Sequence, residues 1–356
     1  MSGELSTPAG PRIGFRTNTL SDERLSYIAQ LGVTDVFINP TEPGGGTGGD
    51  VFEDESDRTS SDRRLPLGPE SVPSVSDLVH LRRAASDAGV ELAGVQSLGF
   101  NMYGDIKFDR EGKTAQLDAI KRLIRNMGQA KLPILGYQWN PRGLLPMRTS
   151  TTNRIRGDAR ANAFDESDLA AVHELADGLD REYEEAELWN NYELFLDEVL
   201  PVAEDAGVTL ALHPVDPPTV ESLCGVPRLF RNPAAFERAL ELHPSDAHGL
   251  KLCLGCFAEM GEDVPDVIRR FGDDIVFVHF RNVVGTYPSF TETFVDDEAG
   301  EFDAVDAMRA LVDVGFEGVI VPDHVPTVEG DTDWGHRARG FTAGYLKGVA
   351  RAIENR

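Results

Sequence analysis

The chain has 356 residues, of which 60 are Asp or Glu and 34 are Lys or Arg, so its formal net charge is −26. A negative field of this size repels phosphate backbones and anionic lipid surfaces, which argues against nucleic acid and membranes as partners. The acidic residues are spread along the whole sequence, a pattern typical of proteins adapted to high salt, where screening relieves their mutual repulsion.

In chain order, short apolar or β-branched runs alternate with amphipathic segments. Eight runs are predicted strands: residues 12–18, 35–40, 91–98, 133–139, 208–214, 250–256, 275–282 and 318–324. The segments between them predict helices, several of which end in Gly, as helix C-termini prefer: residues 21–32, 75–89, 117–130 and 302–315. Eight strand–helix repeats predict an α/β fold, a single (β/α)8 TIM barrel over residues 1–356.

Two long insertions interrupt the predicted barrel. Residues 41–72, after the second strand, are rich in Gly, Ser and charged residues and predict a mobile loop. Residues 140–206, after the fourth strand, begin as a polar loop and continue into a predicted helical insertion. Both insertions follow strand ends, where the active-site loops of a barrel gather, which raises the hypothesis of a lid over that side.

The ends of the last four predicted strands carry residues that bind metals. His213, Cys253, His279 and Asp323 lie at the ends of the fifth, sixth, seventh and eighth strands. Because the carboxyl ends of barrel strands surround a common centre, these side chains are expected to converge. Two imidazoles, a thiolate and a carboxylate suit Mn²⁺, Fe²⁺, Co²⁺ or Zn²⁺, and the mixture does not choose among them.

A second cysteine follows this set closely. Cys253 and Cys256 form a C-x2-C pair, but no second pair is present, which argues against a zinc ribbon. Residues three apart on a strand face opposite sides, so Cys256 is expected to point away from the metal-binding set. Replacing Cys256 is therefore expected to leave metal occupancy unchanged.

The three cysteines, Cys224, Cys253 and Cys256, form no dense disulfide framework and fit a reducing compartment. Residues 1–11 lack the basic and apolar regions of a signal peptide, and no run approaches the roughly 18 apolar residues of a membrane span. We therefore expect a soluble, cytoplasmic protein. A homo-oligomer is compatible with the sequence, which does not fix the oligomeric state.

A series of motifs in one order resembles the mannonate dehydratase family. The motifs are "LPVAEDAGVTLALHPVDPP", "GVPRLF", "KLCLG", "FVHFRN", "FTETF", "VPDH" and "GYLKGVARAIE". The resemblance implies a xylose-isomerase-like barrel, a divalent metal that is usually manganese or iron, and dehydration of D-mannonate to 2-keto-3-deoxy-D-gluconate, a lyase step of hexuronate catabolism. It places the family's metal ligands on the four strand-end residues already named and its catalytic histidine on His324.

Other residues are candidates for the substrate. Arg281 lies two positions after His279, hence on the same face, and is a candidate clamp for a carboxylate, with a structural salt bridge as the alternative. Asn282 beside it joins the predicted substrate-binding set. Arg148 matches a family arginine, with a solvated loop charge as the alternative, and Asp216 is expected to shape a turn.

The sequence also departs from the family pattern. Val321 and Val325 replace family residues around "PDH", and a family histidine is missing from "GFNMYGDIKF". Phe341 stands where the family has a tyrosine thought to act beside the catalytic histidine, and a phenyl ring cannot donate a proton. Phe341 is retained as a substrate-binding candidate, and Tyr345, one helical turn later, is a candidate catalytic substitute, with packing as its alternative.

Three functions stay open on this sequence. The first is a sugar-acid dehydratase. The second is a sugar isomerase or epimerase of the xylose-isomerase-like group, which would move a proton without expelling water. The third is a catalytically silent paralogue that binds a sugar acid. Phe341 in place of the family's tyrosine favours this third function, and the complete metal-binding set argues against it.

Overall fold

The computed structural model describes residues 10–41, 63–139, 148–169, 181–218, 221–223 and 225–354. Most of the predicted mobile loop at 41–72 and two parts of the insertion at 140–206 therefore lie outside the described residues, as does Cys224. None of the helices in the described ranges combines the length and apolar character needed to cross a membrane.

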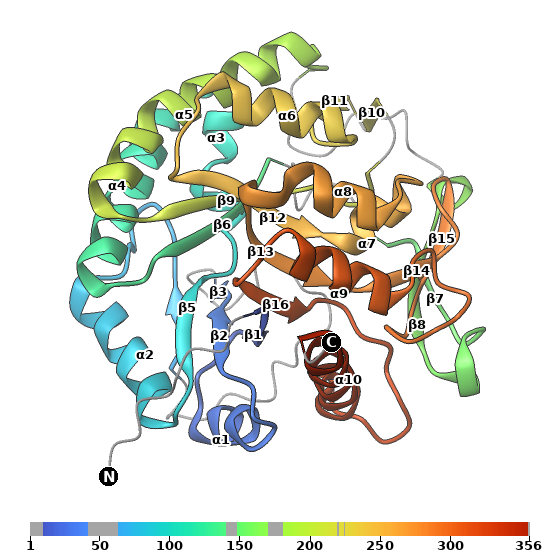
Figure 1. Ribbon diagram of the computed structural model, residues 1–356. Coiled ribbons are helices and arrows are strands. Elements are labelled where there is room, and N and C mark those ends of the chain that lie inside the picture. The colour runs from blue at the N-terminus through green and yellow to red at the C-terminus, as the bar shows by residue number, and fades with distance from the viewer. Residues whose placement is uncertain are drawn as a thin grey trace.

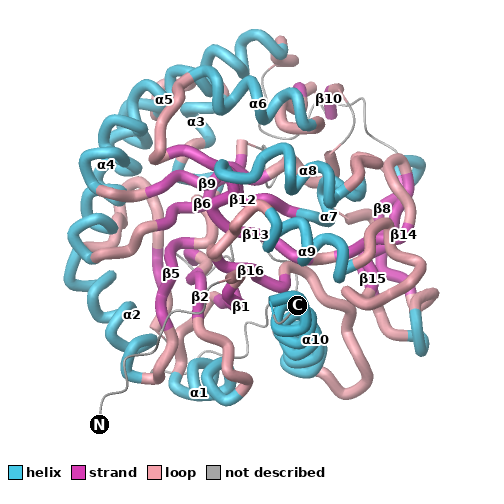
Figure 2. The backbone as a smooth tube through the Cα atoms, viewed as in Figure 1, coloured by secondary structure: helices cyan, strands magenta, loops and turns pink. Residues whose placement is uncertain are grey.

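Eight parallel strands close into a barrel, which confirms the predicted fold (Figures 1 and 2). Each barrel strand falls in or within two residues of a predicted run. In spatial order the strands are β1 (Arg12–Thr17), β16 (Val319–Pro322), β13 (Ile275–Phe280), β12 (His248–Cys253), β9 (Thr209–His213), β6 (Ile134–Gln138), β5 (Glu91–Val95) and β2 (Asp35–Ile38).

Helices surround the barrel, and several of them begin at a residue whose side chain caps the helix. Ser21, Ser74 and Asp303 each accept backbone N–H hydrogen bonds at helix starts. The long helix α5 ends at Gly207, whose φ of 64° is the left-handed conformation that favours glycine. The helices are α1 (Asp22–Gln30), α2 (Val75–Asp87), α3 (Gly104–Lys107), α4 (Lys113–Ala130), α5 (Glu185–Ala206), α6 (Pro233–Leu242), α7 (Leu254–Glu259), α8 (Val264–Phe271), α9 (Ala304–Asp313) and α10 (His336–Glu354).

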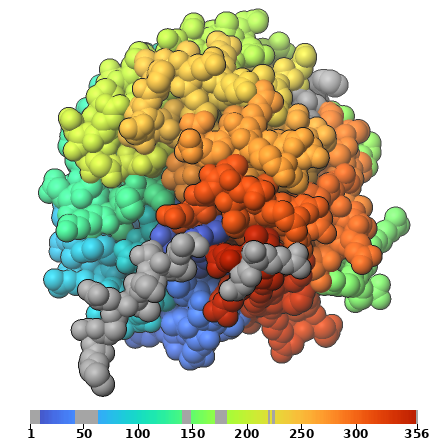
Figure 3. Space-filling model, viewed as in Figure 1, coloured from blue at the N-terminus to red at the C-terminus, as the bar shows by residue number. Residues whose placement is uncertain are grey.

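The helix layer buries the outer face of the barrel. Apolar side chains of the strands and helices form one large core between the two layers. Inside the barrel, Phe37 and Phe277 stack with ring centroids 4.4 Å apart. Together with other buried apolar side chains they fill this part of the barrel interior. In the space-filling view, α1 (blue) lies beside the C-terminal helix α10 (dark red), where Lys347 Nζ donates to Leu31 O (Figure 3).

A second sheet lies at the carboxyl ends of the strands, and two of its strands fall in the part of the insertion that was predicted as a polar loop. Its antiparallel order is β14 (Asn282–Val284), β15 (Ser289–Thr293), β8 (Ala161–Asp165) and β7 (Ser150–Thr152). The helical part of residues 140–206 is α5, which packs on α4 and β9 as a barrel helix. Whether the insertion acts as a lid stays a prediction. Two further two-stranded pairs are β3 (Pro40–Thr41) with β4 (Leu65–Pro66), and β10 (Ser222–Leu223) with β11 (Val226–Pro227).

Candidate active site

The structure brings the four predicted metal ligands together at the mouth of the barrel. Suitable donor atoms of Cys253, His279 and Asp323 all lie within 4.8 Å of one another, and Cys253 is equally close to His213. The rings of His213 and His279 are 5.1 Å apart between centroids. All four side chains are buried. We call these four residues the metal-ligand set.

His213 is held in the state that binds metals. Its Nδ1 lies 2.7 Å from Pro214 O, so Nδ1 carries the hydrogen and Nε2 keeps its lone pair. Burial lowers the pKa of His213 to about 4, which keeps the ring neutral at pH 7. An imidazole fixed by a backbone carbonyl in this way is a common arrangement for a metal ligand.

The other donors also suit a cation. Burial opposes the thiolate of Cys253, but a hydrogen bond from Cys256, the charge of Arg281 and contacts with the two imidazoles together hold its pKa well below the usual value. Likewise, the pKa of Asp323 lies well below its usual range, because His279, His324 and Arg16 outweigh burial. Among the described residues, the buried Nδ1 of His279 has no hydrogen bond. The set therefore fits a divalent metal.

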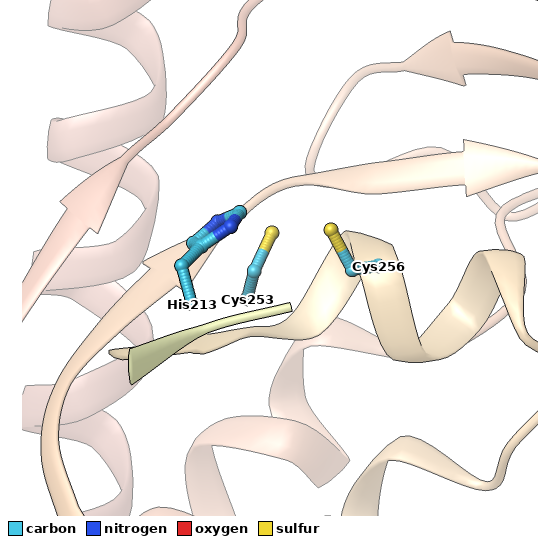
Figure 4. Close-up of side chains that lie close together, drawn as sticks. All are labelled: His213, Cys253 and Cys256. Carbon is cyan, nitrogen blue, oxygen red and sulfur yellow. The ribbon is translucent and has the colours of Figure 1, made fainter. Parts of the chain in front are cut away.

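Cys256 does not point away, contrary to the prediction from strand geometry. Strand β12 ends at Cys253 and helix α7 begins at Leu254, so the three-residue spacing follows a helical turn. Figure 4 shows the sulfur atoms of Cys253 and Cys256 pointing to the same side, next to the His213 ring. Candidate ligand atoms of these three residues lie within 4.8 Å of one another.

A network of buried ion pairs adjoins the metal-ligand set. Arg281 donates from Nε to Asp323 at 3.1 Å and from Nη2 to Asp216 at 3.1 Å, and it also pairs with Glu259. Arg148 donates to Asp216 at 2.5 Å and to Glu292 at 2.7 Å. Arg281, the predicted carboxylate clamp, thus holds protein carboxylates, and Arg148 is a buried member of the same network rather than a solvated loop charge. Asp216 is part of this network rather than only a turn residue.

His324 lies beside the metal-ligand set and pairs with a buried carboxylate. Its Nδ1 is 2.5 Å from Glu292 Oε1, on strand β15 of the second sheet. Although burial raises the pKa of Glu292, the charges of His324 and Arg148 outweigh burial and lower it overall, so Glu292 is an anion. His324 also lines a pocket with residues of both the barrel and the insertion, among them Arg16, Arg160, Asn162, Trp334 and Arg339.

Three predicted site residues are not brought to this cluster. Asn282 donates from its amide to Phe302 O at 2.8 Å and accepts from Val283 N, so its side chain supports a loop. Tyr345 lines a surface groove with residues of α9 and α10. Phe341 stacks on Tyr345 at 6.4 Å between centroids and is 43% exposed.

Sequence reasoning missed several residues of the site. Glu292 and Glu259 were not singled out, and Asp216 was assigned to a turn. Glu292 lies in "FTETF", one of the family-like motifs, which was the available signal for it. No comparable pattern marked Glu259, because its contacts with Arg148 and Arg281 join residues far apart in the chain.

Comparison with known proteins places this geometry in context. The family model described as D-mannonate dehydratase (UxuA) matches residues 25–356. Mannonate dehydratase of Streptococcus suis (strain 05ZYH33) is 30% identical over 317 residues, covering 81% of this chain and 84% of the relative. Mannonate dehydratase 2 of Halalkalibacterium halodurans is 30% identical over 283 residues, covering 71% of this chain and 81% of the relative.

Two solved structures resemble this chain, one in sequence and fold and the other in fold alone. The crystal structure of mannonate dehydratase from Streptococcus suis serotype 2 superposes with a TM-score of 0.79 at 25% identity, covering 98% of this chain and 95% of that chain. A structure of L-ribulose 3-epimerase has a TM-score of 0.58 at 14% identity, covering 97% and 96%. The second likeness concerns the fold alone.

Proposed function

The chain belongs to the D-mannonate dehydratase family, and on this basis we propose that it is a metal-dependent hydro-lyase that converts D-mannonate to 2-keto-3-deoxy-D-gluconate and water. The observation that carries the proposal is the placement of the His324–Glu292 pair directly beside the metal-ligand set at the barrel mouth. This placement puts a group that exchanges protons next to a group of cation donors, as dehydration of a sugar acid requires.

We infer that His213, Cys253, His279 and Asp323 hold the metal. When bound, a divalent cation supplies Lewis-acid stabilisation of the negative charge that develops next to the substrate carboxylate. Arg281 and Arg16 both contact Asp323, at 3.1 and 3.2 Å, and fix the direction of its carboxylate. Because these contacts already orient the Asp323 carboxylate, it needs little rearrangement to bind a metal.

His324 is the residue we assign to proton transfer. Because Nδ1 faces the carboxylate of Glu292, Nδ1 carries a hydrogen, and Nε2 is the atom that gains and loses a proton. Taking a proton from the carbon beside the substrate carboxylate makes an imidazolium, which the Glu292 anion stabilises. The same Nε2 proton can then be given to the departing hydroxyl. Arg148 and Asn162 hold Glu292 in place, at 2.7 and 2.8 Å.

The finer assignments are also proposals. We propose Mn²⁺ or Fe²⁺ as the metal: the mixed N, S and O donors suit first-row transition metals in general, and the resemblance to the mannonate dehydratase family favours manganese or iron among them. We further propose a cytoplasmic enzyme, in line with its sparse cysteines, and one adapted to high salt, which its net charge of −26 supports.

The test is a substrate screen. Purified protein in concentrated KCl with Mn²⁺ is incubated with a panel of aldonic acids, and keto-deoxy acid is measured. We expect product from D-mannonate, and none from the same protein after chelation of the metal. An isomerised product without loss of water would replace this proposal with an isomerase or epimerase. Binding of the acid without any turnover would replace it with a silent, sugar-acid-binding paralogue.

A further inference from the structure

Gln96 lies directly after strand β5 and is buried against the metal-ligand set. Its backbone is fixed on both sides, because N donates to Ile38 O at 2.9 Å and O accepts from Lys251 Nζ at 2.9 Å. Strand β6 approaches closely here: a Cβ atom at Gly136 would lie 2.0 Å from Gln96 O. The glutamine side chain therefore starts from a rigid position in the barrel wall.

The amide of Gln96 meets one edge of the His279 ring. The amide nitrogen lies 2.5 Å from His279 Nε2. The opposite ring nitrogen, Nδ1, lies 3.3 Å from Asp323 Oδ1, on the side of the other metal ligands. Within the described part of the chain, His279 Nδ1 and Gln96 Oε1 are both buried without a hydrogen bond. Buried polar atoms without partners are rare and call for an explanation.

Binding of a metal explains both atoms. A neutral histidine that binds a cation through Nδ1 carries its hydrogen on Nε2, and that hydrogen needs an acceptor. The amide of Gln96 is the group in contact with Nε2. A half-turn of the amide exchanges its oxygen and nitrogen, which occupy nearly the same volume, and brings Oε1 to Nε2.

We propose that Gln96 is a positioning residue for the metal: its Oε1 accepts the Nε2 hydrogen of His279 and thereby directs the Nδ1 lone pair to the cation. The inference rests on the metal-ligand set of the proposed function but needs no substrate. Gln96 itself does not touch the metal. Its contribution is to select one tautomer and one ring orientation of His279, and loss of such a partner typically lowers metal affinity about 10–100-fold.

The test is a metal titration of the metal-free full-length protein with Mn²⁺ and with Zn²⁺. Gln96→Met keeps the length of the side chain and removes the acceptor, so we expect affinity to fall about 10–100-fold. Gln96→Glu keeps an acceptor and should stay within a few-fold of the natural protein. Gln116→Met is the matched control, because Gln116 is also a buried glutamine, but its amide caps Asp105 and Ile106 on α3.

A second measurement does not depend on any variant folding. With Zn²⁺ as a diamagnetic probe, ¹⁵N NMR of the natural protein should show His279 protonated at Nε2 and metal-bound at Nδ1. Metal binding through Nε2, equal affinity in Gln96→Met, or a loss in Gln96→Glu as large as that in Gln96→Met would each overturn the proposal. Absence of metal binding in the natural protein would instead overturn the metal-ligand set itself.

Discussion

Two buried clusters in this barrel each contain histidine, and their surroundings differ. The outer cluster, between the barrel and α5, consists of His248, Tyr137 and Tyr192, with His248 Nε2 2.8 Å from Tyr137 OH and the two hydroxyls 2.8 Å apart. The rim cluster, at the barrel mouth, comprises the metal-ligand set, the His324–Glu292 pair and the ion pairs of Arg148 and Arg281.

The comparison separates burial from function. His248 and Cys253 lie on the same strand, five residues apart, and face opposite sides of the barrel wall. Both are buried, but the partners of His248 are neutral hydroxyls, whereas Cys253 lies among imidazoles, a carboxylate and Arg281. A histidine that is buried among neutral hydroxyls is therefore interpreted as structural. A buried group that lies among paired ionisable side chains is a candidate for a functional site.

The largest expected effect is loss of the thiolate of the rim cluster. Cys253→Ser replaces a good anionic ligand by an alcohol, so bound metal and dehydratase turnover should both fall to background. Metal content by elemental analysis and turnover at saturating D-mannonate measure this. Cys256→Ala is the control. Cys256 donates a hydrogen bond to Cys253, so this substitution should lower metal affinity by no more than about 10–100-fold. Equal metal in Cys253→Ser and the natural protein would contradict the ligand assignment.

Removal of the proton-transfer group should leave the metal in place. His324→Asn is expected to lower kcat about 10²–10⁴-fold, the usual contribution of general acid–base catalysis, with metal content unchanged. Turnover and elemental analysis on the same sample separate the two roles. If the metal is lost together with turnover, His324 is a ligand and the division of labour within the rim cluster is wrong.

Glu292→Gln tests the orientation of His324 from the second sheet. The amide lacks the negative charge that stabilises an imidazolium, and it can also present its NH₂ group to Nδ1, so kcat should fall about 10²-fold, the lower end of the range for acid–base help. Asn162→Ala, which removes the hydrogen bond from an uncharged amide to Glu292 at 2.8 Å, is the milder comparison. Unchanged kcat in Glu292→Gln would remove Glu292 from the catalytic assignment.

The outer cluster should affect stability and leave the metal alone. Burial lowers the pKa of His248 to about 4, against about 6.5 in an unfolded chain. The unfolded state therefore binds a proton first as pH falls. The contribution of His248 to the free energy of unfolding is therefore fully present above pH 6.5 and is lost as the pH falls toward 4. Between pH 7.5 and 5 the free energy of unfolding should decrease by about 2 kcal/mol. Denaturant unfolding of the metal-free protein measures this loss.

His248→Gln is the control for the pH experiment, because it keeps a hydrogen-bonding group and does not titrate. Its unfolding free energy should fall less steeply over the same pH range, while its metal affinity stays that of the natural protein. Parallel pH curves for the two proteins would show that His248 does not contribute, and that other groups, such as His213 with its own lowered pKa, account for the loss.

The barrel could be predicted from the sequence because its signals are local. Apolar runs of strand length, capped helices and terminal glycines fall within short windows, and all eight barrel strands were found in this way. The second sheet could not, because its pairs join distant segments, such as Ala163 with Thr291. The short insertion strands carry no apolar period strong enough to distinguish them from loops.

The candidate site divides in the same way. The four proposed ligands could be named because each lies at or next to the end of a strand, a position that the sequence reveals. Glu259 escaped notice because its partners are set by tertiary contacts. The predicted direction of the Cys256 side chain was wrong because the strand ends at Cys253 and a helix begins directly after it. Residues three apart face opposite sides of a strand but nearly the same side of a helix.

The smallest expected effect tests a residue outside both clusters. The resemblance predicts that Phe341→Tyr restores a missing proton donor and raises turnover, unless Tyr345 or a water already supplies the proton. In the structure, the Phe341 ring packs against Phe294 and Tyr345, with centroids 6.2 and 6.4 Å away, and is 43% exposed. The Phe341 ring is thus packed with other aromatic rings and partly exposed to solvent, whereas Glu292 of the His324–Glu292 pair is buried. We therefore expect kcat and KM for D-mannonate to change less than about two-fold, within the usual small effect of an exposed substitution. A ten-fold rise in kcat would show that α10 moves toward the rim cluster during the reaction, and would return Phe341 to the active site.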